Sequence, residues 1–196
     1  MRLFVALALP WSHRETLVGL CGGLPGARWV APHNLHLTLR FIGETRSDSA
    51  DEIDLALQSL QVRRFELALA GTGTFVRARR LGGHRAPRRP GLLPASAPMT
   101  TTLWAGVARN ERLDHLQGKI ETALQRIGLE PERRRFQPHV SLARVDGVAE
   151  AVLAGWVQAH NLLRTEPVTI DSFTLFSSQP GPDQPVYTAE VDYALT

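Results

Sequence analysis

Two short segments of the chain each place a histidine two residues ahead of a hydroxyl side chain. His36 precedes Thr38 in the segment HLTL, and His139 precedes Ser141 in the segment HVSL. Alternate side chains of an extended strand point to the same face, so each imidazole shares a face with its hydroxyl. The residues between them are leucine or valine, which makes the opposite face suited to a core. The repetition, about half a chain apart, favours one site built from both segments over two unrelated half-buried histidines.

These groups suit proton transfer beside a phosphoryl group. Histidine has an unperturbed pKa of about 6.5, so one imidazole can accept a proton while the other donates one. Thr38 and Ser141 can donate hydrogen bonds to non-bridging oxygens, where negative charge develops in the transition state. Hydrolysis of a phosphodiester needs both proton transfers, one from the attacking water and one to the leaving oxygen.

Three further side chains near the two segments could bind a substrate. By strict alternation Arg40 shares the face of His36, where it could hold a phosphate. Arg144 falls on the face opposite His139 and reaches the site only if its strand has a bulge or ends early. Phe41 could stack on a base, although alternation places it on the apolar face. A solvated arginine or a core phenylalanine is the competing interpretation for each.

The periodicity of the flanking sequence predicts the elements that carry both segments. Helical spacing of apolar residues predicts helices over residues 13–22, 48–60, 111–127 and 148–160. Apolar alternation predicts strands over residues 2–9, 34–42, 64–70, 103–108, 135–144, 168–178 and 186–195. The order strand, helix, histidine strand, helix and strand occurs once in each half. It predicts an internal duplication of the α+β class, with His36 and His139 facing each other across a cleft.

A basic stretch separates the two halves. Residues 77–101 are rich in Arg, Pro and Gly and lack periodicity, which predicts an exposed loop within a single domain of residues 1–196. The lobes on either side would come roughly from residues 1–76 and 102–196. The arginines of this loop, and Arg133 to Arg135 before the second segment, could grip an RNA backbone or simply be solvated.

Composition narrows the class of protein. The 196 residues are 43% hydrophobic and 21% charged, as in a globular protein, and the net charge of +3 is compatible with a phosphate-bearing ligand. Cys21 is the only cysteine, so no internal disulfide can form, and we expect a cytoplasmic protein. The apolar start MRLFVALALPW is too short to span a bilayer and favours a first strand over a signal peptide.

Other kinds of site have little support in the sequence. Zinc usually takes three or four ligands, whereas each segment offers one histidine and no carboxylate, so we expect no metal and no cofactor. The stretch CGGLPG lacks the frame of a phosphate-binding P-loop and is better interpreted as the end of a helix. No G-x-S-x-G segment is present to support a serine hydrolase.

Taken together, the segments NLHLTLRFIGE, LWAGV and PHVSLAR resemble those of the 2H phosphoesterases. They are most similar to the RNA 2′,3′-cyclic phosphodiesterase branch, also called 2′-5′ RNA ligase-like proteins. Such proteins carry two His-x-Thr/Ser-x motifs on facing strands, and the resemblance covers nearly the whole chain. Ser141 stands where threonine is commoner, and the loop before LWAGV is longer than the family leads us to expect.

The resemblance implies a bilobal fold of two pseudo-symmetric halves, each with an antiparallel sheet flanked by helices. It implies a monomer that hydrolyses 2′,3′-cyclic phosphate ends of RNA to 2′-phosphates without a metal. His36 would then be the proton donor and His139 the proton acceptor, although the near-symmetry of the motifs leaves both assignments open. Thr38 and Ser141 would contact the phosphate.

Two other kinds of function remain open on the sequence alone. The same histidines could act on a small cyclic nucleotide, or join RNA ends through a 2′-5′ bond, which is transesterification in reverse. A protein of a different class, an RNA-binding module, could hold phosphate in the cleft without turnover. Retention of both histidines and both hydroxyls argues against a pure binder, which needs no titratable pair.

Overall fold

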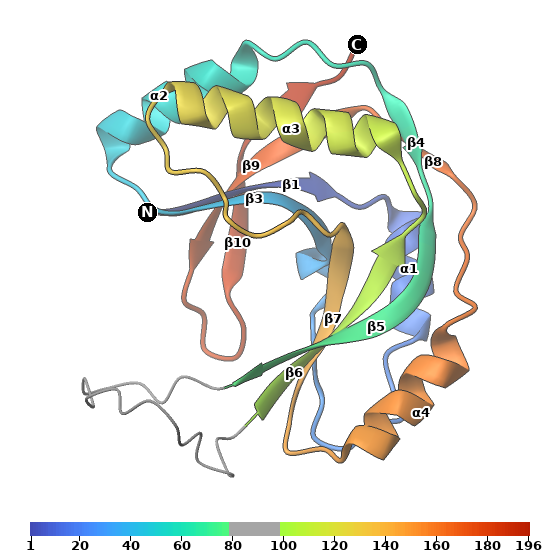
Figure 1. Ribbon diagram of the computed structural model, residues 1–196. Helices are drawn as coiled ribbons and strands as arrows, with labels where there is room; N and C mark the ends of the chain where they lie inside the picture. The colour runs from blue at the N-terminus through green and yellow to red at the C-terminus, as the bar shows by residue number, and fades with distance from the viewer. Residues whose placement is uncertain (79–98) are drawn as a thin grey trace.

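The structure, a computed structural model, describes residues 1–78 and 99–196 (Figure 1). The predicted helices and strands occur in the predicted order, but the sequence does not predict the short strand at residues 28–29, and the strands predicted over 64–70 and 168–178 are each divided in two. The helices are α1 (Trp11–Gly19), α2 (Ser47–Gln58), α3 (Glu111–Arg126) and α4 (Glu150–His160), with one 3-10 turn over Pro32–Asn34. The strands are β1 (Arg2–Ala8), β2 (Arg28–Trp29), β3 (His36–Glu44), β4 (Phe65–Leu67), β5 (Leu69–Ala78), β6 (Met99–Val107), β7 (His139–Asp146), β8 (Val168–Ile170), β9 (Ser172–Gln179) and β10 (Val186–Ala194). The predicted α+β class is confirmed.

The main sheet runs in the order β10-β9-β1-β3-β7-β6-β5, with every neighbouring pair antiparallel. Its two histidine strands meet at the centre through one residue pair, Leu37 opposite Val140. Each of these residues directly follows a motif histidine. Outward from this pair the strands match in order, β3 with β7, β1 with β6 and β9 with β5, as a pseudo-two-fold axis through the pair requires.

The two repeats exchange their outer strands. β5 belongs to the first repeat but pairs with β6 of the second, and β9 of the second repeat pairs with β1 of the first. A small second sheet, β4 with β8, joins the repeats again. Each half of the main sheet therefore contains strands from both sides of the basic stretch.

The helices follow the same exchange. α2 and α3 lie side by side over the half of the molecule that holds β1, β3, β9 and β10, and α4 lies at the opposite end beside β5 (Figure 1). In α4, the Trp156 indole donates a hydrogen bond of 3.1 Å to the Gly22 carbonyl beyond α1. No helix in the described ranges is long and apolar enough to cross a membrane.

The amphipathic pattern of α3 is confirmed by its packing. Its four regularly spaced apolar side chains are buried, and burial of each contributes about 2 kcal/mol. The helix begins at Asn110, whose side chain accepts hydrogen bonds of 3.1 Å from the amides of Arg112 and Leu113. The buried positions are Leu113, Leu116, Ile120 and Leu124.

The strands that border the basic stretch extend further than predicted. β5 continues to Ala78 and β6 begins at Met99, so only residues 79–98 of the predicted loop are without a described structure. The glycines of GTGTF conceal this strand in the sequence, because glycine disfavours strands. A Cβ at Gly73 would overlap the Trp104 ring, so glycine lets this indole pack on the neighbouring strand. The predicted RNA contacts of Arg79, Arg80, Arg85, Arg88 and Arg89, and the side chain of Arg77, lie outside the described residues.

Candidate active site

Both motif histidines occupy the first position of their strands and are restrained in the same way. His36 Nδ1 lies 2.7 Å from the Asn34 carbonyl oxygen, and His139 Nδ1 lies 2.7 Å from the Gln137 carbonyl oxygen. A carbonyl oxygen can only accept, so each Nδ1 must carry the hydrogen and donate it. In the neutral imidazoles, Nε2 is therefore the atom left to accept a proton, and in the charged form it can donate one.

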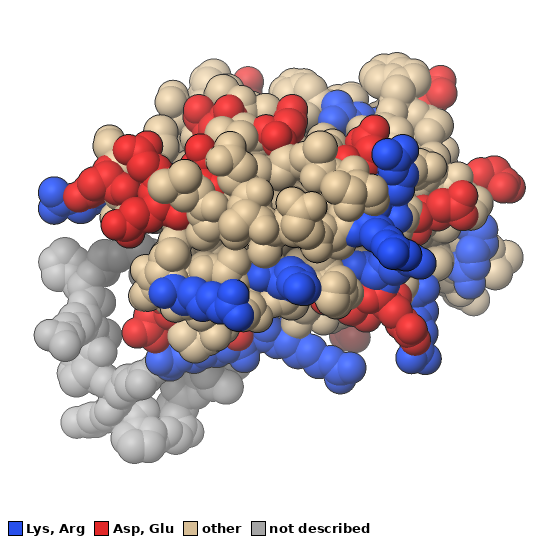
Figure 2. All heavy atoms as spheres, turned by 90° about the horizontal axis from the view of Figure 1, so that it is seen from above, with Lys and Arg blue, Asp and Glu red and all other residues tan. Residues whose placement is uncertain are grey.

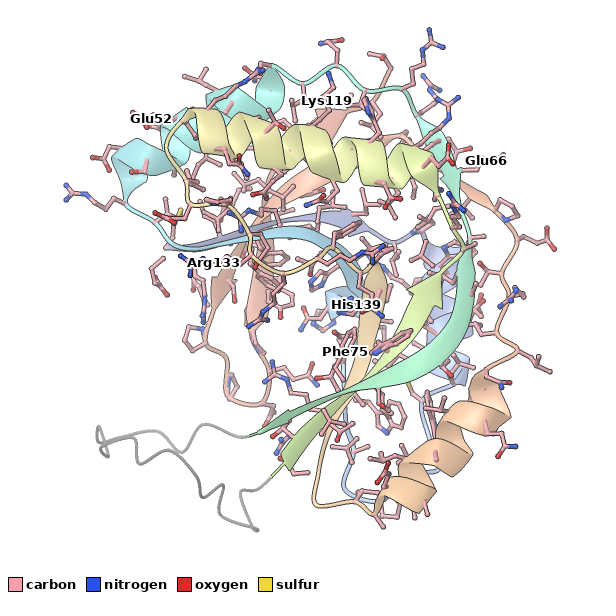
Figure 3. The ribbon with its side chains drawn as sticks, viewed as in Figure 1. Glu52, Glu66, Phe75, Lys119, Arg133 and His139 are labelled. Atoms are coloured by element: carbon pink, nitrogen blue, oxygen red, sulfur yellow. The ribbon has the colours of Figure 1, made fainter. Side chains whose placement is uncertain are left out.

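Aromatic side chains surround each imidazole. The His36 ring centre is 5.0 Å from that of Phe4 and 5.2 Å from that of Tyr187, whose ring meets it edge-on. His139 meets the ring of Phe75 edge-on at 4.9 Å, with Trp104 further away at 6.4 Å. Phe75 extends from β5 toward His139 in Figure 3. These side chains come from strands β1 and β10 for one histidine and β5 and β6 for the other, so the strand exchange completes both environments.

The two imidazoles interact electrostatically. Burial lowers the pKa of His36 below its usual 6.5, because the charged ring loses hydration. Repulsion from His139 and from Arg14 on α1 lowers this pKa further, and the hydrogen bond to Asn34 opposes the shift. His139 therefore lies close enough to affect the protonation of His36, which places both in one site.

Thr38 and Ser141 lie on the face of the sheet that carries the two histidines, one on each flank of the central residue pair. With Leu37 opposite Val140, antiparallel pairing directs Thr38 toward His139 and Ser141 toward His36. Thr38 and His139 line one cavity of about 500 Å³, together with Phe75 and Phe136. Cavities of this size are common for small ligands.

A bulge in each histidine strand changes which side chains reach the site. Ala6 pairs with Thr38 and Val5 with Arg40, so Leu39 is an extra residue; likewise Leu142 is extra between Ser141 and Ala143. After such a bulge the alternation is reversed. Phe41 then joins the face of His36, 62% exposed, with its ring 5.9 Å from Phe4. Arg144 joins the face of His139, which is the condition under which the sequence allowed it to reach the site.

Arg40, in contrast, turns away from the face of His36, and the prediction from strict alternation is wrong. Its side chain is 8% exposed and forms ion pairs with Glu121 of α3, 2.8 Å from Nε, and with Glu132, 3.6 Å from Nη1. It also donates hydrogen bonds to the carbonyls of Glu130 and Phe41. The guanidinium is thus occupied by protein groups, although Arg40 borders the 500 Å³ cavity.

Arg144 is exposed and lies near the His36 side of the site. Burial raises the pKa of Tyr187, and the charge of Arg144 acts against this increase, so the guanidinium is close to the phenol. Tyr187 in turn contacts His36. No hydrogen bond or ion pair joins the Arg144 side chain to another residue in the described ranges, which leaves it able to contact an anion.

A clasp formed by Asn34 and Gln184, which the sequence did not reveal, holds the backbone ahead of His36. The Gln184 side chain accepts from the Ala31 amide at 3.0 Å and donates to the Trp29 carbonyl at 2.7 Å. The buried Asn34 side chain donates to the Pro185 carbonyl at 3.0 Å. Gln184 lies in a turn that the sequence marks only by its prolines and glycine, so no local signal indicates its long-range contacts.

The described ranges contain no group of three or more His, Cys, Asp or Glu side chains arranged to hold a metal ion. The site described above is instead a pair of imidazoles with hydroxyl, aromatic and arginine neighbours.

The chain is similar in sequence to proteins named RNA 2′,3′-cyclic phosphodiesterase. The chain is 35% identical over 126 residues to such a protein of Aeropyrum pernix, and the match covers 64% of this chain and 60% of that relative. It is 26% identical over 190 residues to that of Archaeoglobus fulgidus, covering 95% of this chain and 96% of the relative. It is 27% identical over 204 residues to that of Escherichia coli, covering 100% and 97%.

Solved structures agree with these relatives. A crystal structure of a phosphoesterase superposes with a TM-score of 0.75 at 25% identity, covering 100% of this chain and 98% of that one. E. coli LigT in its apo form gives a TM-score of 0.74 at 25% identity, covering 100% and 97%. Residues 7–82 and 106–187 match the family described as LigT like Phosphoesterase, which confirms the resemblance seen in the two histidine motifs. The chain belongs to the LigT-like phosphoesterase family.

Proposed function

We propose that this protein is an RNA 2′,3′-cyclic phosphodiesterase, which opens the cyclic phosphate at an RNA end to leave a 2′-phosphate. The observation that carries the proposal is the matched pair of imidazoles, each donating a hydrogen bond from Nδ1 to a carbonyl, which makes Nε2 the nitrogen that exchanges a proton. Relatives that match nearly the whole chain bear this name, which supports the same substrate here.

In the proposed reaction, water attacks the phosphorus of the cyclic phosphate while the bond from phosphorus to O3′ breaks. His139 Nε2 accepts a proton from the water, and His36 Nε2 donates a proton to O3′. The product keeps the phosphate on O2′, and both histidines have exchanged their protonation states. Each proton transfer contributes about 10²–10⁴ in rate.

The neighbouring groups suit the charge that the reaction develops. Thr38 and Ser141 would donate hydrogen bonds to the non-bridging oxygens, and Arg144 would supply a positive charge beside them. His36 must enter charged, although its pKa in the free protein is lowered by burial. A bound phosphate anion offsets the repulsion from His139 and Arg14, and so would raise the pKa of His36 when the substrate is in place.

The experiment that tests this function measures hydrolysis of an oligonucleotide with a 2′,3′-cyclic phosphate end, in the presence of EDTA. Wild type, His36→Ala and His139→Ala are compared across pH. We expect turnover by the wild type, a bell-shaped pH profile, and losses of about 10²–10⁴ in kcat for each variant. Robust activity in either variant would refute the paired-histidine mechanism.

The same assay separates the other functions. Turnover that needs an added metal would favour a metal-dependent site, and binding of RNA without turnover would favour a binding module. Products joined through a 2′-5′ bond, from ends that carry a cyclic phosphate and a 5′-hydroxyl, would show ligation by the same two histidines. Hydrolysis of a free cyclic nucleotide at a rate equal to that of oligonucleotides would favour a small-molecule substrate.

We also propose that the protein acts as a cytoplasmic monomer in RNA processing. Both histidines, both hydroxyls and their aromatic neighbours come from one chain, which supports a site complete in a single copy. Sedimentation of the purified protein across a range of concentrations tests the monomer, and an active dimer at low concentration would contradict it.

A further inference from the structure

Three successive arginines lie on the segment that leads from α3 to the second histidine. Arg133, Arg134 and Arg135 are exposed, and their guanidinium groups form no ion pair or hydrogen bond with another residue in the part of the chain that the structure describes. Figure 3 shows Arg133 partway along this segment, which then continues to His139. Seen from the side of α2 and α3, basic side chains lie mainly in the lower half of Figure 2 and acidic ones in its upper half.

The backbone that carries these arginines is held by hydrogen bonds to the ion pair of Arg40, which is buried, with Glu121, which is partly buried. Glu121, which pairs with Arg40, also accepts a hydrogen bond of 2.9 Å from the Glu132 amide. Arg40 donates to the Glu130 carbonyl, and the Glu132 side chain accepts from the Arg134 amide at 3.1 Å. Because this backbone is already held in place, binding of a ligand to the arginines should lose little backbone conformational entropy.

Two cavities meet at Arg134. The 500 Å³ cavity that holds His139 is also lined by Arg134 and Arg135, with Phe75 and Phe136 as flat apolar surfaces. A second cavity of about 630 Å³ is lined by Arg133 and Arg134. Arg134, together with Arg40 and Glu132, therefore borders both the cavity beside His139 and a second cavity along the arginine segment.

We propose that Arg134 and Arg135 bind the phosphate on the 5′ side of the terminal nucleotide, so that the enzyme favours cyclic phosphates at chain ends over free nucleoside 2′,3′-cyclic phosphates. The assignment rests on the proposed function, which places the terminal ribose between the two histidines. From there the RNA chain continues through its 5′-phosphate, and exposed guanidinium groups that have no partner among residues 1–78 and 99–196 match that anion. The rings of Phe75 and Phe136 offer surfaces for the terminal base.

The kinetic test compares two substrates that differ by that one phosphate. They are uridine 2′,3′-cyclic phosphate and the same molecule with a 5′-phosphate. We expect the wild type to prefer the second in kcat/KM, through KM. In the double variant Arg134→Gln/Arg135→Gln this preference should fall by about tenfold, whereas kcat/KM for the first substrate should change by less than about twofold.

A matched control removes one positive charge elsewhere. Lys119→Gln changes an exposed side chain of α3 that lines a different cavity, and it should leave the preference intact. Raising salt should weaken the preference in the wild type, because salt screens the contact between the guanidinium groups and the 5′-phosphate, and it should change the preference little in the double variant.

A binding measurement separates this proposal from the proposed function. Calorimetry with uridine 2′-phosphate, and with its 5′-phosphorylated form, reports the 5′-phosphate contact without turnover. If the wild type binds the second ligand more tightly and the double variant does not, the arginine subsite stands even where no hydrolysis is found. Equal discrimination by wild type and double variant, in kinetics and in binding, would overturn the subsite and leave the phosphodiesterase function in place.

Discussion

At the scale of single residues, the two histidines share a restraint and differ in their surroundings. Each donates a hydrogen bond from Nδ1 to a backbone carbonyl, so Nε2 is fixed as the reactive nitrogen before any substrate binds. His36 additionally lies against Phe4 and Tyr187 and within the field of Arg14, a combination that disfavours its charged form. The roles of acid and base therefore depend on how a bound anion changes this balance.

The pKa of His36, with and without a bound anion, tests whether its surroundings disfavour the charged imidazole. Its pKa in the free protein is expected below 6.5, and it should rise when uridine 2′-phosphate binds or when Arg14→Gln removes a repelling charge. Two-dimensional NMR of the imidazoles across pH measures both changes. Because His36 must be protonated to act as the acid, the descending limb of kcat/KM should move to higher pH in Arg14→Gln. A midpoint above 6.5 in the free wild type would contradict the environment described for this ring.

At the scale of elements, the paired bulges decide what each histidine strand presents to the site. Without them, Arg40 would face the substrate, and Phe41 and Arg144 would not. With them, one arginine supports the structure and the other is available to an anion, although both follow a histidine motif closely in the sequence.

These two arginines should respond differently to the same substitution. Arg40→Gln leaves Glu121, whose side chain is 17% exposed, without its cationic partner and should lower the free energy of unfolding by about 2 kcal/mol. Arg144→Gln removes an exposed side chain and should change stability by less than about 0.5 kcal/mol, while kcat/KM falls at least about tenfold. Urea denaturation and steady-state kinetics on both variants measure the contrast. Equal stability of the two would mean that the ion pair under the arginine segment has no structural role.

The clasp formed by Asn34 and Gln184 at the β9–β10 turn should affect catalysis only by positioning His36, because it contacts the backbone ahead of this residue. Gln184→Ala removes the hydrogen bonds to Ala31 and Trp29 and loosens the backbone that leads to His36. We expect kcat to fall about tenfold with KM nearly unchanged, since an imperfectly placed acid weakens the transition state more than binding. Hydrogen exchange at the Ala31 amide should increase in the same variant. Unchanged exchange together with a reduced kcat would point to a different cause.

At the scale of the whole molecule, the exchange of β5 and β9 makes each half of the sheet depend on both repeats. β1, whose residues Leu3 to Leu7 are at most 2% exposed, is covered on one edge by a strand from the far end of the chain. Neither repeat contains all the strands of its own half-sheet.

Fragments of the two repeats should therefore fail to fold apart. Residues 1–78 alone would leave β1 without β9 and β5 without β6, and residues 99–196 alone would leave β9 and β6 with one open edge each. Open edges and an uncovered core favour aggregation over folding. Circular dichroism on each fragment, and on both mixed, measures this expectation. A fragment that unfolds cooperatively by itself would show that the exchange is not needed for stability.

The sequence predicts features that depend on neighbouring residues, such as helices and most strands. It does not predict features that depend on contacts between distant parts of the chain. The four helices and most strands follow from periodicity, with the exception of β2 and of the parts of β5 and β6 that border the basic stretch, and the amphipathic residues of α3 lie where their spacing indicates. The bulges at Leu39 and Leu142 are set by pairing with β1 and β6, which alternation within one strand cannot register. The same applies to Gln184 and the aromatic neighbours of the histidines, whose partners are distant in the chain.

The single pair of Leu37 with Val140 joins the two halves of the main sheet. Each half carries its own imidazole, anchored to its own backbone, and in the described ranges no second register pair joins β3 directly to β7. The Nδ1 bond of each histidine is local to its own strand, whereas the placement of one Nε2 atom relative to the other depends on how the two half-sheets pack together. A substitution that changes this packing can therefore alter the spacing of the two imidazoles while leaving both Nδ1 bonds in place.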